Sequence, residues 1–233
     1  MSVEQIGRQV QPMRNAAKLS VRRHDAVRSQ ERSFIMETDD DTQPAATAEP
    51  RNSYLEEKAF KSRTLLIFGS ITDAVAADVT RRLIALDADS PEKPIDILVS
   101  SPGGHLESGD AIHDIVRFIS APVNMIGTGW VGSAATHLYL AAPRERRVCL
   151  PNTRFLIHQP SGGAGGQATD IAIQAQEIIK ARHRIAHEIA RETGKPIDVV
   201  LADIERDRWL SAAEAVEYGL VSRIIQRKTE LRE

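Results

Sequence analysis

Residues 123–140 are the most informative stretch for the fold of this chain. They begin as a short apolar run, pass through three glycines and end in helix-forming residues. This order predicts a buried strand, a glycine turn and a helix. Ser133 lies where the turn meets the helix. At such an elbow a hydroxyl is exposed beside the free backbone N–H groups of the first helical turn, a geometry that suits a nucleophile next to an oxyanion site.

Two other interpretations of the elbow compete with a nucleophile. Ser133 can be an N-cap, which is the commonest role of a serine before a helix. Residues 127–132, GTGWVG, also match the G-x-G-x-x-G fingerprint of dinucleotide sites. That fingerprint needs an acidic residue about 20 positions further on to bind the ribose. Here the next predicted strand ends at His158 and Gln159, so the nucleotide interpretation is disfavoured.

Composition narrows the class of protein. A chain of 233 residues with 42% hydrophobic residues can bury a substantial core, and a net charge of −2 does not favour nucleic-acid binding. The single cysteine, Cys149, excludes an internal disulfide and is typical of a reducing compartment. No apolar run approaches a membrane span, and no secretory signal is recognisable. We therefore expect a cytoplasmic protein that binds neither nucleic acid nor membrane.

Three parts follow one another along the chain. Residues 1–60 are rich in charged and polar residues with little apolar periodicity, so we expect a disordered N-terminal extension. Residues 61–226 form the predicted folded domain, and residues 227–233 are a polar tail that we expect to be loose. In the domain, strands and helices alternate, which predicts an α/β fold of repeated β-α-β units around a parallel sheet. Residues 143–147, PRERR, are expected to be an exposed loop.

One predicted helix, residues 170–193, is unusually long for a compact domain and is ended by Gly194 and Pro196. Its length would exceed about 30 Å, so part of it is expected to project or to pack on another subunit. A later helix begins at Ser211, with Glu214 at capping-box spacing.

Functional groups of parallel α/β sheets gather at the carboxyl ends of the strands. There the sequence places the segment 101–104, SPGG, together with the Ser133 elbow and His158. Because Gly104 has no side chain, a substrate carbonyl can approach its N–H closely, and the N–H of Ala134 is the second candidate oxyanion donor.

The general base must be chosen among seven histidines. His158 ends a predicted strand and would enter the cleft from a separate element, whereas His137 lies four residues after Ser133 and could reach back toward it along the helix. His183 and His187 have the i, i+4 spacing of zinc ligands but no evident third ligand, so we expect surface residues and no metal site.

An acid that orients the imidazole is expected in residues 203–209, DIERDRW, which supply Asp203, Glu205 and Asp207. Spacing alone does not choose among these three carboxylates. Solvated charges before a helix explain them equally well.

From residue 62 to residue 225 the chain resembles the Clp protease proteolytic subunit (ClpP) family, serine peptidases of the crotonase-like superfamily. The motifs that carry the resemblance are, in chain order, DSPEKPI, SSPGG, the glycine-x-x-x-serine elbow, LPNTRFLIHQPSGG, GQATDI and ERDRWLSAAEAVEYGLV. The resemblance implies the ClpP/crotonase-like fold with a projecting long handle helix.

Carried over position by position, the family's nucleophile falls on Ser133, its general base on His158 and its acid on Asp207, with oxyanion donors on Gly104 and Ala134. The resemblance implies a self-compartmentalising serine endopeptidase that degrades unfolded polypeptides in stacked rings of this chain or of its paralogues. It implies no cofactor and no metal in this chain, because ATP would be used by a separate AAA+ unfoldase.

Two departures from the family leave an alternative open. Trp130 stands near the elbow where small residues are usual, and we expect it to narrow or reshape the pocket. Asp96 and Leu98 occupy positions where the family commonly has tyrosines that receive the unfoldase, and a carboxylate disfavours that apolar contact. The alternative is a weakly active or inactive paralogue that serves as a structural subunit of mixed rings.

Overall fold

The computed structural model describes residues 53–163 and 165–232. The helices are α1 Ser53–Lys61, α2 Asp73–Asp89, α3 Leu106–Phe118, α4 Ala134–Tyr139, α5 Ala168–Thr193, α6 Ile197–Asp203 and α7 Ala212–Tyr218, with two short 3₁₀ helices, η1 Arg144–Arg146 and η2 Lys228–Arg232. The strands are β1 Thr64–Phe68, β2 Ile95–Ser101, β3 Val123–Gly132, β4 Arg147–Cys149, β5 Arg154–Ile157, β6 Arg208–Ser211 and β7 Arg223–Ile224.

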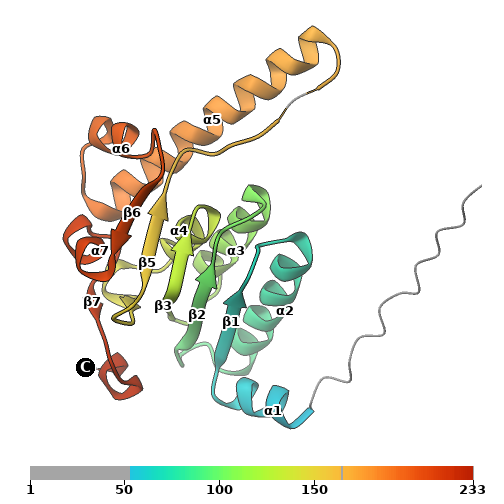
Figure 1. The fold of residues 1–233 in the computed structure, drawn as a ribbon. Helices are drawn as coiled ribbons and strands as arrows, with labels where there is room; N and C mark the ends of the chain where they lie inside the picture. The colour runs from blue at the N-terminus through green and yellow to red at the C-terminus, as the bar shows by residue number, and fades with distance from the viewer. Residues whose placement is uncertain (1–52, 164, 233) are drawn as a thin grey trace, which may run out of the picture. The chain divides into compact units, whose positions relative to one another are not determined.

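The strands form one sheet in the order β1-β2-β3-β4-β7, and β5 pairs with both β3 and β6. Every pairing is parallel except that of β5 with β6. The parallel sheet and its β-α-β crossovers confirm the predicted fold class (Figure 1).

Strand β3 runs through the glycines that were expected to end it. Its first half pairs with β4 and its second half with β5, and its register against β2 shifts between Val99 and Ser101. The shift is a bulge at which Gly129 takes a φ of +60°. The glycines therefore interrupt the pairing with β2 without ending the strand, and the turn into the helix is confined to Ser133.

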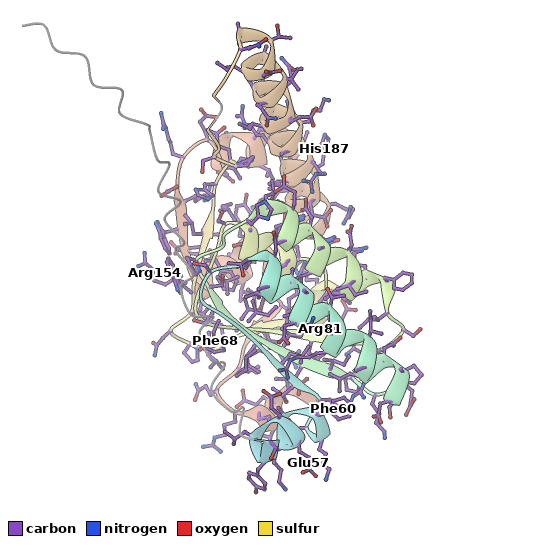
Figure 2. The ribbon with its side chains drawn as sticks, turned by 90° about the vertical axis from the view of Figure 1, so that its right-hand side faces the viewer. Glu57, Phe60, Phe68, Arg81, Arg154 and His187 are labelled. Carbon is purple, nitrogen blue, oxygen red and sulfur yellow. The ribbon has the colours of Figure 1, made fainter. Side chains whose placement is uncertain are left out.

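The core lies between the sheet and the helices that cover one of its faces. Helices α2, α3 and α4 bury their apolar stripes there, and Thr72 caps α2 by accepting the Val75 N–H, as predicted. The opposite face carries Phe68 and Arg154 on the side away from these helices (Figure 2). Phe68 is 53% exposed, so this face of the sheet remains uncovered over β1.

Helix α5 projects beyond the sheet, as predicted (Figure 1). Its buried residues all lie in its second half, at Ile185, Ala186, Glu188 and Ile189, while its first half is exposed. Gly194 ends it in the left-handed conformation.

Three segments differ from their predictions. Helix α1 occupies residues 53–61, most of which were assigned to the extension, while residues 1–52 lie outside the described part. The polar tail forms η2 and packs Leu231 against a small apolar cluster on the sheet. In the predicted exposed loop, Arg147 is fully buried because it donates to the Glu192 carboxylate at 3.1 Å and to the Glu192 carbonyl at 2.9 Å.

Candidate active site

Ser133 lies in a strained backbone conformation, with φ 56° and ψ −125°. The Ser133 N–H donates to the Leu156 carbonyl at 2.9 Å, which ties the elbow to β5. The serine side chain makes no capping hydrogen bond to α4. The N-cap interpretation is therefore wrong for the side chain, and the hydroxyl is left to face another group.

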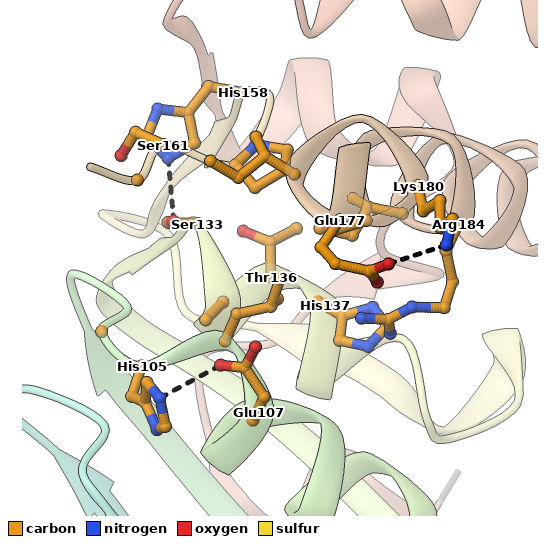
Figure 3. Close-up of a pocket in the computed structure, with 18 of the residues that line it drawn as sticks. His105, Glu107, Ser133, Thr136, His137, His158, Ser161, Glu177, Lys180 and Arg184 are labelled. Atoms are coloured by element: carbon orange, nitrogen blue, oxygen red, sulfur yellow. Dashed lines mark hydrogen bonds and ion pairs between the residues drawn. The ribbon is translucent and has the colours of Figure 1, made fainter. Parts of the chain in front are cut away.

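That group is His158, which follows β5 and lies above the elbow (Figure 3). The Ser133 hydroxyl and His158 Nε2 are 2.8 Å apart, and His158 Nδ1 is 2.8 Å from Asp207 Oδ1. A carboxylate can only accept, so Nδ1 carries the proton, and Nε2 of the neutral ring accepts the serine hydroxyl proton.

Asp207 reaches the imidazole because α6 and β6 return the chain to the sheet beside β5. Neither element was predicted from the sequence, where residues 203–209 were interpreted either as the source of the acid or as solvated charges before the helix at Ser211. The antiparallel pairing of Ile157 with Arg208 brings Asp207 next to His158. Of the three candidate carboxylates, Asp203 instead contacts Arg208 and Tyr218, and Glu205 pairs with Arg182.

The other candidate histidines lie elsewhere. His137 points away from Ser133, since its Nε2 is 2.8 Å from the Asp110 carboxylate. His183 and His187 are exposed on α5. Over the described residues, no group of three or more His, Cys, Asp or Glu side chains could hold a metal ion.

The backbone of Gly103, in the segment before α3, lies against the elbow at Ser133. A Cβ on Gly103 would lie 2.7 Å from the Ser133 Cβ and 3.0 Å from the Ala134 nitrogen. Ile71 donates to the Gly103 carbonyl and accepts from the His105 N–H, both at 2.9 Å. In this parallel bridge the N–H of Gly104, between those two residues, points away from Ile71. Gly104 and Ala134 therefore both offer backbone groups beside Ser133.

A cavity of about 830 Å³ opens beside Ser133 and His158 (Figure 3). Its walls come from the start of α3, from α4, from the loop after His158 and from the inner side of α5. The lining contains both apolar and charged side chains, among them Leu106, Ile157, Ile178, Glu107, Glu177 and Arg184. The space is large enough for a side chain of an extended peptide.

Trp130 does not belong to the cavity lining, contrary to the expectation that it reshapes the pocket. Its ring stacks on Trp209 with a centroid distance of 6.1 Å, and the Arg154 guanidinium lies over the Trp209 ring. The Asp96 carboxylate has a hydrogen-bond partner within the sheet, because it accepts from the Asn124 side chain at 2.8 Å.

A serine, a histidine and an aspartate hydrogen-bonded in series at the carboxyl ends of a parallel sheet are the arrangement of the serine hydrolases. Comparison with known sequences narrows this class. The sequence model of the family described as Clp protease matches residues 47–228. The chain therefore belongs to the Clp protease family, and it is a serine-type Clp protease.

Two relatives and one solved structure illustrate the similarity. The chain is 58% identical over 182 residues to ATP-dependent Clp protease proteolytic subunit 2 of Gluconobacter oxydans, covering 77% of this chain and 81% of the relative. It is 53% identical over 193 residues to proteolytic subunit 3 of Rhizobium etli, covering 82% and 99%. The solved structure of a ClpP1 point mutant from Listeria monocytogenes superposes with a TM-score of 0.71 at 45% identity, covering 76% of this chain and 99% of that one. Within the described residues, no helix is both long and apolar enough to cross a membrane.

Proposed function

We propose that the chain is a serine endopeptidase in which Ser133 is the nucleophile, His158 the general base and Asp207 the acid that orients the imidazole. The observation that carries this proposal is the continuous hydrogen-bonded chain of the three side chains, with 2.8 Å at each step. His158 has the one tautomer that can take the serine proton, because Asp207 occupies its other nitrogen.

In the acylation step, Ser133 Oγ attacks the carbonyl carbon of the scissile peptide bond while His158 Nε2 takes the hydroxyl proton. The C–N bond then breaks and the same proton passes to the leaving amine. In deacylation a water molecule attacks the ester carbonyl, gives its proton to His158 and releases the carboxylate product, and the proton returns to Ser133. The cycle is balanced without a cofactor or a metal in this chain.

The backbone N–H groups of Gly104 and Ala134 donate hydrogen bonds to the carbonyl oxygen and stabilise the negative charge that develops on it. Gly104 is suited to this role because its N–H points away from Ile71. Ala134 is suited because it is the first residue of α4, where the N–H groups have no partner within the helix. Each donor of this kind lowers the barrier by about 3 kcal/mol.

The substrates are unfolded polypeptides, cleaved in a chamber that is formed by stacked rings of this chain or of its paralogues. The projecting half of α5 supports this assembly, since Ile171, Ile173 and Ile179 are 42%, 53% and 47% exposed on it. The printed names of the relatives, ATP-dependent Clp protease proteolytic subunits, support a separate ATP-driven AAA+ unfoldase as the partner. We place the complex in the cytoplasm.

The alternative of an inactive structural paralogue is not favoured. All three side chains of the proposed triad are present and joined, and Trp130 packs outside the cavity.

One paired experiment tests the proposal. Native mass spectrometry measures the assembly of the full chain, and hydrolysis of a small fluorogenic peptide measures its activity, with Ser133→Ala as the control. We expect a ring assembly that hydrolyses the peptide, and no hydrolysis by Ser133→Ala. An assembled wild-type chain without activity, which gains activity only on mixing with a second subunit, would instead favour the structural paralogue.

A further inference from the structure

The proposed mechanism leaves two buried imidazoles unused, and one of them, His137, lies one helical turn after Ser133. His113 on α3 and His137 on α4 stack with a centroid distance of 4.7 Å and an interplanar angle of 8°. Their side chains are 9% and 5% exposed. Buried polar rings must be held by hydrogen bonds, so the partners of this pair define its role.

His137 is held by Asp110, a residue of α3. The Asp110 carboxylate lies 2.8 Å from His137 Nε2 and makes a two-point ion pair with Arg184 of α5, at 2.8 and 2.7 Å. Burial opposes the charge, but hydrogen bonds from His137 and Arg184 lower the pKa of Asp110 to about 2. The permanent carboxylate fixes a proton on Nε2 of His137.

The other ring is held from the opposite side. His113 Nε2 is 3.2 Å from Glu188 of α5, and its Nδ1 is 3.2 Å from Asp114 of its own helix. Glu188 also pairs with Arg191, and Arg117 lies 4.0 Å from it. The charged groups around the stack thus come from α3 and α5, and α4 is joined to both helices through His137.

His137 is also linked directly to the elbow. Its backbone N–H donates to the Ser133 carbonyl at 3.2 Å, and the Thr136 N–H donates to the same oxygen at 2.9 Å. Helix α4 has only six residues, too few to be stable without tertiary contacts. Because Ser133 is held in a strained conformation, something outside α4 has to keep the helix in place.

We propose that the Asp110–His137 pair positions the Ser133 nucleophile by anchoring α4 to α3 and, through Arg184, to the long helix α5. The inference rests on the proposed peptidase function. His137 and Arg184 line the cavity (Figure 3), whereas Asp110 does not line it. A change at Asp110 therefore acts on the reaction only through its neighbours, which makes it a positioning residue and the cleanest place for a test.

Three variants of the full chain decide the question, measured as kcat and KM for a fluorogenic peptide alongside wild type and Ser133→Ala. Asp110→Ala leaves the His137 N–H and the Arg184 guanidinium without their acceptor, and kcat should fall about tenfold while KM stays within about twofold. Asp110→Asn keeps an acceptor of the same shape, and kcat should stay within about threefold of wild type. Glu92→Ala is the control, because it removes an exposed carboxylate in the turn before β2, outside this network, and it should leave kcat unchanged.

Each outcome has one meaning. If Asp110→Ala and Asp110→Asn both hydrolyse the peptide at the wild-type kcat, or if only KM changes, the positioning role is wrong. If Asp110→Ala fails to fold, Asp110→Asn decides: a kcat lowered about two- to threefold at constant KM supports the positioning role, and an unchanged kcat overturns it. If Ser133→Ala retains the activity, the proposed peptidase function fails and the positioning role falls with it, which distinguishes the two failures.

Discussion

Gly104 lies against the backbone of Ile71 so closely that there is no room for a side chain. A Cβ on residue 104 would lie 2.3 Å from the Ile71 carbonyl oxygen and 2.8 Å from its nitrogen, and φ is +152°. Gly104→Ala must displace the loop that carries the proposed oxyanion donor. We expect kcat to fall at least about 100-fold, measured by peptide hydrolysis.

Gly165→Ala is the matched control for this substitution, because a Cβ there meets no atom within 4 Å and Gly165 does not line the cavity. It should retain the wild-type kcat. Equal losses in the two variants would contradict the special role of Gly104.

Asp207 is expected to act on the tautomer of His158 rather than on the fold. Its side chain is 65% exposed, so Asp207→Asn should leave the thermal midpoint nearly unchanged. The amide can donate to Nδ1 and so favours the wrong tautomer, and kcat should fall about 10⁴-fold. Asp203→Asn provides the contrast, because Asp203 bonds Tyr218 and Arg208 and should affect stability more than turnover. A wild-type kcat for Asp207→Asn would remove Asp207 from the triad.

The Arg147–Glu192 pair is expected to be a structural requirement of the fold. Burial lowers the pKa of Arg147, and Glu192 compensates the buried charge. Glu192→Ala leaves the guanidinium unpaired inside the protein, and we expect the free energy of unfolding to fall by about 3 kcal/mol in urea denaturation. Removing the exposed Glu177 partner of Lys180 should cost no more than about 0.5 kcal/mol. Similar losses at both sites would argue against this account of Arg147.

Stability should depend on the protonation of His113. Burial opposes the charged ring, but hydrogen bonds to Glu188 and Asp114 outweigh it and raise the pKa of His113 above 6.5. Because the pKa of His113 is higher in the folded protein than in the unfolded chain, protonation of His113 stabilises the fold fully below pH 6.5. This contribution is lost as the pH rises through the pKa of the folded protein.

The unfolding free energy of wild type should therefore decline above pH 6.5, and His113→Gln should show a smaller decline. Chemical denaturation at several pH values between about 5 and 9 measures both slopes. Parallel slopes for the two proteins would show that His113 does not contribute to this pH dependence.

The sequence predicted the layout of this fold where the local signals were strong. The capped starts of α2 and α7, the glycine end of α5 and the apolar run of β2 all lie where propensity and burial agree. The choice of Ser133, His158 and Asp207 together came from the resemblance to the ClpP family, since spacing alone left it open; 25 residues separate the first two and 49 the last two.

The remainder depends on tertiary contacts that the local pattern does not contain. Arg147 belongs to a charged run, and only Glu192, 45 residues later, makes its burial possible. Strand β6 has no apolar alternation of its own and forms because β5 pairs with it. His137 could not be separated from His158 by spacing, because its partner Asp110 lies on another helix.

Covalent labelling of the full chain with a fluorophosphonate probe, located by peptide mass spectrometry, shows whether His158 activates Ser133. We expect the probe to modify Ser133 in wild type and to react at least about 100-fold more slowly with His158→Ala. In His137→Ala the probe should still modify Ser133. Modification of Ser133 at an unchanged rate in His158→Ala would contradict the claim that this imidazole activates the serine.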